Sequence, residues 1–222
     1  MSYLQYNDNF RGTGEANEKG KTLEVFLEEY DPKKYDCPSN TVDIAVFKAE
    51  KDGLRLLMIR RKNHPNIGFW ALPGGFVDLR ENLEDAAKRE LEEETGVTGI
   101  SPVQVRTWGD FDRDPRWRVI TTLYCTVIGE QLPVKGGDDA AEARWFDVKL
   151  EETVSPKGAG LVTLTLTDPE SDLTLRSQAK RETRGDGVLS EDVYHQLSTD
   201  RIAGDHGLLI MDALRFVENR RK

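Results

Sequence analysis

A mixed α/β (α+β) fold is predicted for this chain of 222 residues by three features of its sequence. Two apolar runs of β type, residues 42–47 and 54–59, flank a Lys-Asp-Gly turn and predict a β-hairpin. Apolar side chains recur at every fourth position across residues 83–91, which predicts an amphipathic helix. A second apolar stripe predicts a closing helix over residues 202–219.

Composition limits the possible classes of protein. The formal net charge of −9 suits a soluble cytoplasmic protein and argues against a broad nucleic-acid-binding surface. Residues 1–20 lack the apolar segment of a signal peptide, and no run of about 18 apolar residues predicts a membrane span. Cys37 and Cys125 indicate neither a zinc site nor a disulfide framework. We therefore expect a reducing, cytoplasmic location and neither a membrane nor a nucleic acid partner.

The chain is expected to begin with a flexible leader or partner-contacting arm over residues 1–21, which are polar with few aromatic anchors. Residues 22–30 show a short helical pattern that stops before Pro32, because the residue before a proline is pushed out of helical geometry. A main domain over residues 22–150 includes this helix and the hairpin. Its further strands are predicted at residues 69–72, 102–108, 119–127 and 144–146.

After the main domain the composition becomes polar, and an insertion is expected before the closing helix. The insertion is predicted to hold a β-hairpin around an Asp-Pro-Glu-Ser-Asp turn and then a short helix capped by Ser190. The insertion covers residues 151–200. Within it, the hairpin strands are expected at residues 161–167 and 173–176 and the short helix at residues 191–197. A C-terminal helix that packs on the main domain is expected over residues 201–222.

The amphipathic helix that begins at residue 83 concentrates carboxylates on one face. Glu90 and Glu94 are four residues apart and point the same way, while Glu93 lies close to that face and Arg89 supplies a counter-charge. Three carboxylates repel one another unless a cation is present, and hard divalent ions such as Mg²⁺ and Mn²⁺ are bound through carboxylate oxygens. The cluster therefore predicts a Mg²⁺ or Mn²⁺ site, with Glu90 and Glu94 as main ligands and Glu93 as a further ligand or base.

The ends of this helix fit the same interpretation. Gly74 and Gly75 precede it, and two residues without side chains let the backbone turn tightly and approach a ligand. Asn82 is a candidate N-cap, and Gly96 suits the position after the last turn. An exposed acidic helix behind a Gly-Gly turn would explain a single Glu-x-x-Glu, but the pattern here is longer.

Two loops carry residue types that bind phosphate. Residues 60–65 form a basic loop, which is either solvated or a phosphate contact. The loop over residues 109–118 mixes arginines with aromatic side chains, which can hold a phosphate and stack on a base or ribose. The candidate substrate-binding residues are Arg60, Arg113, Arg116, Trp117 and Phe111.

The glycines and carboxylates belong to one longer pattern, which comprises Gly75, Glu81, Arg89-Glu90-Leu91, Glu93-Glu94 and Gly96-Val97. This pattern resembles a complete Nudix box, the signature of the Nudix hydrolases. The resemblance implies the Nudix fold, in which a mixed β-sheet is sandwiched between helices, and hydrolysis of a nucleoside diphosphate linked to another moiety. It also implies that the Gly74 carbonyl completes the metal shell, that Arg89 orients the carboxylates, and that Glu81 supports the loop.

A catalytic base outside the box is common in this family. Asp138, Asp139 and Glu142 are the candidates here, and an equally good interpretation makes them turn and cap residues. His206 lies beside apolar residues on the predicted closing helix, which favours a packed or capping histidine over a catalytic one.

Further segments resemble the ADP-ribose pyrophosphatase-like branch of the family, namely residues 35–46, 70–78, 112–116, 138–146 and 202–206. This resemblance implies hydrolysis of ADP-ribose to AMP and ribose 5-phosphate by a homodimer. The same branch contains transcriptional regulators of NAD metabolism, in which a ligand-sensing Nudix domain precedes a DNA-binding domain, and such a regulator without useful catalysis is the alternative. The complete set of box carboxylates, and an end of the sequence soon after residue 206, favour the hydrolase.

Overall fold

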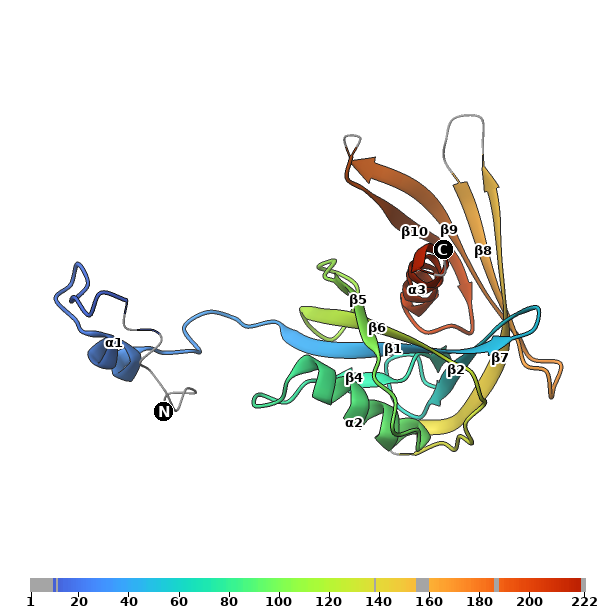
Figure 1. The fold of residues 1–222 in the computed structure, drawn as a ribbon, viewed down its shortest axis with the longest axis horizontal. Helices are drawn as coiled ribbons and strands as arrows, with labels where there is room; N and C mark the ends of the chain where they lie inside the picture. The colour runs from blue at the N-terminus through green and yellow to red at the C-terminus, as the bar shows by residue number, and fades with distance from the viewer. Residues whose placement is uncertain (1–9, 11, 138, 155–159, 186–187, 221–222) are drawn as a thin grey trace. The chain divides into compact units, whose positions relative to one another are not determined.

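The computed structural model describes residues 10, 12–137, 139–154, 160–185 and 188–220 (Figure 1). They belong to two compact units, one ending at Cys37 and one beginning at Pro38. In the first unit the predicted short helix is confirmed as α1 (Leu23–Glu29), and the Thr22 hydroxyl accepts a hydrogen bond from the Val25 N–H at 3.5 Å. All further elements belong to the second unit.

The second unit is built on one mixed sheet with the strand order β10-β9-β8-β7-β2-β1-β6-β5. β1 (Ser39–Glu50) pairs antiparallel with β2 (Gly53–Arg61), which is the predicted hairpin, and parallel with β6 (Val119–Ile128). β4 (Gly74–Phe76) pairs with β1 and brings the two glycines against it. The remaining strands are β3 (Trp70–Ala71), β5 (Val103–Trp108), β7 (Ala140–Val154), β8 (Gly160–Thr167), β9 (Thr174–Gly185) and β10 (Ser190–Asp200).

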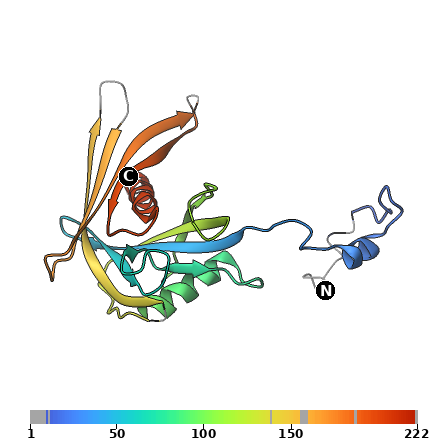
Figure 2. The same cartoon turned by 180° about the vertical axis from the view of Figure 1, so that it is seen from behind.

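Helices α2 (Leu83–Thr95) and α3 (His206–Arg220) cover opposite faces of this sheet, as Figure 1 and Figure 2 show. Side chains of β1 alternate between the two faces, as expected for a strand. Ile44 and Val46 pack in the core cluster that contains α2, whereas Ala45 and Phe47 pack in the cluster that contains α3. The predicted mixed sheet between helices is therefore confirmed.

α2 begins and ends where the sequence indicates. Its apolar stripe is buried around Leu91, and Gly96 follows with φ 74°, a left-handed conformation that suits glycine. Asn82 occupies the N-cap position in an extended conformation, but its side chain caps no backbone N–H. Its amide donates instead to the Asp85 carboxylate at 3.2 Å.

The predicted hairpin after β7 is confirmed as β8 and β9, although β9 continues to Gly185. The short helix expected over residues 191–197 is wrong, because these residues lie in β10, which pairs antiparallel with β9. Tyr194 of β10 is buried in the core cluster that contains α3. Pairing with an available strand and burial of this ring outweigh the local helical pattern.

Two boundaries also differ from the expected ones. β7 runs through residue 150, so the added strands extend the main sheet without a break there. α3 begins at His206 and not at residue 202, because Ile202 forms a parallel bridge with Trp70 and Gly204 turns the chain with φ 45°.

No helix within the described ranges is long and apolar enough to cross a membrane. Both cysteines are free thiols, with Cys37 exposed and Cys125 buried. Burial raises the pKa of Cys125 to about 12, so this thiol stays protonated at neutral pH.

Candidate active site

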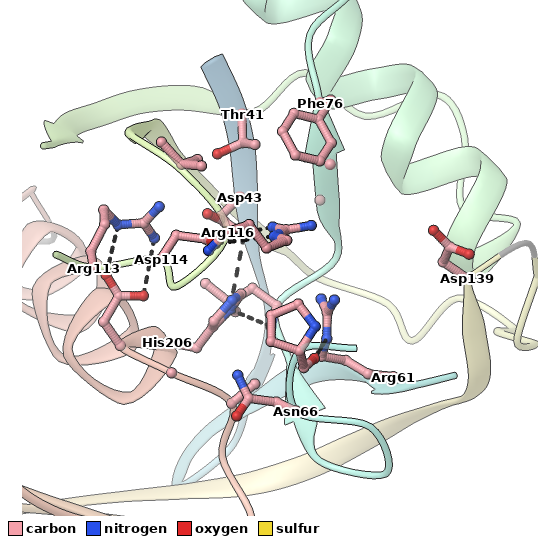
Figure 3. A pocket seen from close by; sticks show the side chains of 18 of the residues that line it. Thr41, Asp43, Arg61, Asn66, Phe76, Arg113, Asp114, Arg116, Asp139 and His206 are labelled. Atoms are coloured by element: carbon pink, nitrogen blue, oxygen red, sulfur yellow. Dashed lines mark hydrogen bonds and ion pairs between the residues drawn. The ribbon is translucent and has the colours of Figure 1, made fainter. Parts of the chain in front are cut away.

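One pocket lies where β4, the end of α2, the 109–118 loop and the start of α3 meet (Figure 3). Three residues of the predicted metal site or its glycine turn line it: Gly74, Gly75 and Glu94. The other walls come from segments far apart in the sequence. Their polar and aromatic side chains include Asp43, Arg61, Phe76, Arg113, Arg116 and His206.

Arg89 holds three carboxylates beside this pocket. Its guanidinium donates to both carboxylate oxygens of Glu81, at 2.8 and 2.9 Å, and its Nη1 donates to Glu90 at 2.8 Å and to Glu93 at 2.9 Å. A further bond at 3.0 Å joins Nη2 to the Phe76 carbonyl. The Glu81 bonds are the largest cause that raises the pKa of Arg89, which therefore stays charged.

Glu94 is the most buried carboxylate of the cluster, with 5% of its surface exposed. Its Oε2 accepts a hydrogen bond from the Gly74 N–H at 2.8 Å. Burial raises the pKa of Glu94 from 4.5 to about 8, and the nearby Glu90 and Asp43 carboxylates act in the same direction. A positive charge placed near this carboxylate would stabilise its ionised form.

Both glycines are required by close contacts. A Cβ at Gly75 would lie 2.6 Å from the Glu90 carboxylate, and a Cβ at Gly74 would lie 2.1 Å from the Val42 carbonyl oxygen. Burial also raises the pKa of Glu90, against the opposing effect of Arg89. The Gly-Gly strand thus lies directly against the carboxylates, as a backbone without side chains allows.

The donor set fits a hard divalent ion. Glu90 and Glu94 are desolvated carboxylates with raised pKa values, and the backbone at Gly75 approaches one of them closely. Within the described part of the chain, no three Asp, Glu, His or Cys side chains already form a metal-binding group. Arg89 holds Glu90 and Glu93, while the Gly74 N–H holds Glu94.

Two of the three arginines that line the pocket are paired. Arg113 binds Asp205 through two bonds, at 2.8 and 3.0 Å, and Arg116 binds Asp114 through two bonds, at 3.0 and 2.8 Å. Arg61 donates its Nε–H to the Pro65 carbonyl at 2.8 Å and makes no ion pair with any described residue. The terminal nitrogens of Arg61, and the Nη1 of Arg113 and of Arg116, have no partner among the described residues and can bind an anion.

Arg60 lies outside the pocket and pairs with Glu142 of the neighbouring β7. Arg61 lines the pocket and Arg60 does not, and the pairing of β2 with β7 shifts its register between these two residues. The role predicted for Arg60 stays a prediction. The structure adds Arg61, which belongs to the basic segment 60–65, for which a phosphate contact was one of the two interpretations of the sequence.

The aromatic residue that lines the pocket is not one of the two that were predicted. Phe111 and Trp117 are exposed and do not line the pocket. Phe76, 46% exposed, does line it, and the Arg116 guanidinium lies 5.1 Å from its ring centroid. Phe76 follows the two glycines directly and was not among the predicted substrate-binding residues.

The three candidate bases outside the box differ in their position relative to the pocket. Asp138 lies outside the described residues. Asp139 lines the pocket and accepts a bond from the Asn63 amide at 2.9 Å, and Figure 3 shows it apart from the other labelled side chains. Glu142 is bound to Arg60 and Arg144 and does not line the pocket.

His206 lines the pocket, although the sequence favoured a packed or capping histidine. The ring is largely buried and accepts the Leu72 N–H on Nδ1 at 3.0 Å. Asp43 lies next to it, and its Oδ2 accepts a bond from the Thr121 hydroxyl at 2.6 Å. No local pattern points to Asp43, because its neighbours in the pocket come from distant parts of the chain.

An α+β fold in which an acidic helix packs against a Gly-Gly strand beside an arginine-lined pocket is the arrangement expected of a metal-dependent hydrolase of phosphorylated ligands. The family model described as NUDIX domain matches residues 38–162, more than half of the chain. The chain therefore belongs to the Nudix family.

Two curated relatives are each 42% identical to this chain. One is the ADPR responsive transcriptional repressor NtrR of Acinetobacter baylyi, aligned over 59% of this chain and 52% of the relative. The other is the ADP-ribose pyrophosphatase of Methanocaldococcus jannaschii, aligned over 55% of this chain and 71% of the relative. The chain thus spans about half the length of the first relative.

The chain is also similar to a solved structure, a MutT/nudix family protein from Enterococcus faecalis, with 32% sequence identity and a TM-score of 0.68. The alignment covers 91% of this chain and 71% of that chain. Because so much of this chain is aligned, the similarity extends into the strands added after the main domain.

Proposed function

We propose that this protein is a metal-dependent Nudix pyrophosphohydrolase that cleaves ADP-ribose to AMP and ribose 5-phosphate. Support comes from the complete box, from the pocket beside it, and from the 42% identity to an ADP-ribose pyrophosphatase. The observation that carries the proposal is the position of Glu94, a buried carboxylate with a raised pKa in the wall of that pocket.

The residues of the cluster have distinct roles in this proposal. Glu90 and Glu94 would hold Mg²⁺ or Mn²⁺, with the Gly74 carbonyl as a further ligand and Glu93 as either a ligand or the base. Arg89 keeps the carboxylates oriented through the bonds described above. When bound, the ion neutralises the charge that develops on the diphosphate oxygens.

The pocket walls bind and orient the diphosphate. The free end of Arg61 binds a phosphate group, and Phe76 with Arg116 offers a flat surface for a base or ribose. Water adds to one phosphorus while the bond from that phosphorus to the bridging oxygen breaks, which gives two phosphate monoesters. The proton of the water passes to a carboxylate, for which the candidates are Glu93, held by Arg89, and Asp139, in the pocket wall.

The proposal is tested by measuring AMP or phosphate release from ADP-ribose, NADH, nucleoside triphosphates and nucleotide sugars. We expect the highest kcat/KM for ADP-ribose, complete loss of activity in EDTA, and recovery on addition of Mg²⁺ or Mn²⁺. Turnover of another compound alone would reassign the substrate. No turnover of any compound with either ion would refute the hydrolase.

The second candidate is a sensor that binds ADP-ribose without useful hydrolysis. The 42% identity to an ADPR responsive transcriptional repressor favours it. A gel retardation assay at physiological salt separates the two, because a regulator retains DNA and the enzyme does not. A cytoplasmic location and a homodimer are parts of the main proposal, and sedimentation velocity tests the dimer.

A further inference from the structure

His206 is the first residue of α3, and one of its two ring nitrogens has a fixed partner. The Leu72 N–H donates to Nδ1 at 3.0 Å, so Nδ1 must carry a lone pair. A neutral imidazole has one donor and one acceptor nitrogen, and the proton is therefore on Nε2. The Asp43 Oδ1, 3.9 Å from Nδ1, is then a neighbouring acceptor and not an ion-pair partner.

The residues around the His206 ring are themselves held in place. Asp205, the residue before it, is held by the two bonds from Arg113, and the Asp205 carbonyl accepts the Leu208 N–H at 2.8 Å at the start of α3. Asp43 is held by Thr121. The Leu72 bond and burial restrain the ring itself, so it loses little conformational freedom when a ligand binds.

Several donors of the pocket are left for a ligand. Arg113 and Arg116 each give two nitrogens to a carboxylate, so the donors without a partner among the described residues are their Nη1 groups, the end of Arg61, the Asn66 amide and the Nε2–H of His206. The edge of the ring that carries Nε2 is the one without a protein partner among the described residues. A fixed N–H donor in a partly desolvated pocket binds an anionic oxygen well.

We propose that the Nε2–H of His206 donates a hydrogen bond to a phosphate oxygen of the bound nucleotide, and that the Leu72 N–H sets the tautomer that makes this possible. This inference rests on the proposed function in one respect, that the ligand carries a diphosphate. It gives His206 a binding role, and it assigns the start of α3 to the ligand-binding wall of the pocket.

Two substitutions separate the two nitrogens of the ring. His206→Asn keeps an acceptor near the position of Nδ1, for the Leu72 N–H, and removes the distal donor. His206→Gln keeps a donor near the position of Nε2 and removes the acceptor. His195→Asn is the matched control, because His195 lies exposed on β10 and does not line the pocket.

The readouts are the Kd for ADP with Mg²⁺, measured by calorimetry, and the Tm of each variant. We expect His206→Asn to keep the wild-type Tm and to raise the Kd by about ten- to a hundredfold, the usual contribution of a hydrogen bond to a charged group. His206→Gln is expected to bind ADP more tightly than His206→Asn but to melt at a lower temperature. Nitrogen-15 NMR of the wild-type ring is expected to show the Nε2–H tautomer.

A wild-type Kd for ADP in His206→Asn, or an Nδ1–H tautomer in the free protein, would overturn the inference. ADP binding does not depend on hydrolysis, so failure to cleave ADP-ribose would refute the enzyme while leaving this test intact. If the wild-type protein does not bind ADP, the proposed role of His206 is also refuted.

Discussion

Single residues determine how tightly the acidic cluster is held against the sheet. Arg89 bonds to Glu81, Glu90 and Glu93 at once, and the Gly74 N–H holds Glu94. Gly75 matters for a different reason, because any side chain there would displace the Glu90 carboxylate. The position of the Glu90 carboxylate therefore depends on a neighbouring residue that has no side chain.

Gly75→Ala tests this dependence. The new Cβ would lie 2.6 Å from the Glu90 carboxylate, so Glu90 must move, and we expect kcat/KM for ADP-ribose to fall by on the order of 100-fold. Gly53→Ala is the control, since no atom lies within 4 Å of a Cβ at that position. Equal activity of the two variants would mean that the position of Glu90 is not critical.

Glu94 makes the stability of the protein depend on pH when no divalent ion is available. Its pKa is raised from 4.5 to about 8, so the folded state keeps a proton that the unfolded state releases between these values. This contribution to stability is fully present below pH 4.5 and is lost as the pH rises through about 8. In EDTA we expect the free energy of unfolding to fall over this range, by on the order of a few kcal/mol at most.

Urea unfolding at a series of pH values measures this effect, and Glu94→Gln is the comparison because it removes the titrating group. The wild-type protein should lose stability between pH 4.5 and about 8, and the variant should lose less. Identical pH profiles for the two proteins would contradict the raised pKa.

Arg61 and Arg60 form a matched pair for substrate binding. Arg61→Ala removes the unpaired cation of the pocket and should raise KM for ADP-ribose more than it lowers kcat, because a phosphate contact made throughout the reaction contributes to binding. Arg60→Ala removes a residue paired with Glu142 outside the pocket and should leave both constants nearly unchanged. The reverse order of effects in steady-state kinetics would restore the role predicted for Arg60.

Secondary structure elements differ in how far their own sequence determines them. α2 has its apolar stripe and its terminal Gly96 within one short segment, so its limits were predicted well. β10 has no such local signal, since it is a strand because β9 lies beside it and α3 covers Tyr194. Contacts between distant segments decided that element, and a single segment does not contain them.

Arg106 connects elements that the strand order places far apart. From β5 its Nη1 donates to the Asp192 carbonyl of β10 at 3.3 Å, and its Nε lies 3.1 Å from the Asp212 carboxylate of α3. Burial raises the pKa of Asp212, and Arg106 opposes that shift. The two ends of the sheet and the helix between them therefore share one charged side chain.

Arg106→Ala should destabilise the fold by about 1–3 kcal/mol, because it leaves the Asp212 carboxylate buried without its cation. Urea unfolding at pH 7 measures the loss. Arg184→Ala, at the exposed end of β9, is the control and should change stability little. Similar losses in both variants would mean that the contact is no more important than an ordinary surface charge.

The whole molecule assembles the pocket from separate parts of the chain. The metal-binding carboxylates could be predicted because they lie on one helix, where spacing alone puts them on one face. The sequence indicated the segment with Arg61 as one candidate for a phosphate contact and favoured a packed His206, and nothing in it pointed to Asp43. These three residues come from β2, α3 and β1 and meet only in the folded protein. The sequence thus predicted the carboxylate cluster, but it did not predict how the residues that line the pocket come together.

Magnesium-dependent AMP release from ADP-ribose, compared between the wild-type protein and Glu94→Gln, decides whether the buried carboxylate performs the proposed chemistry. We expect the variant to stay folded, with a Tm at least as high as that of the wild-type protein without the ion, and to lose a factor of ~100 or more in kcat, in line with the contribution of metal-ion catalysis. Near-normal turnover by a folded Glu94→Gln protein would contradict the assignment of this site.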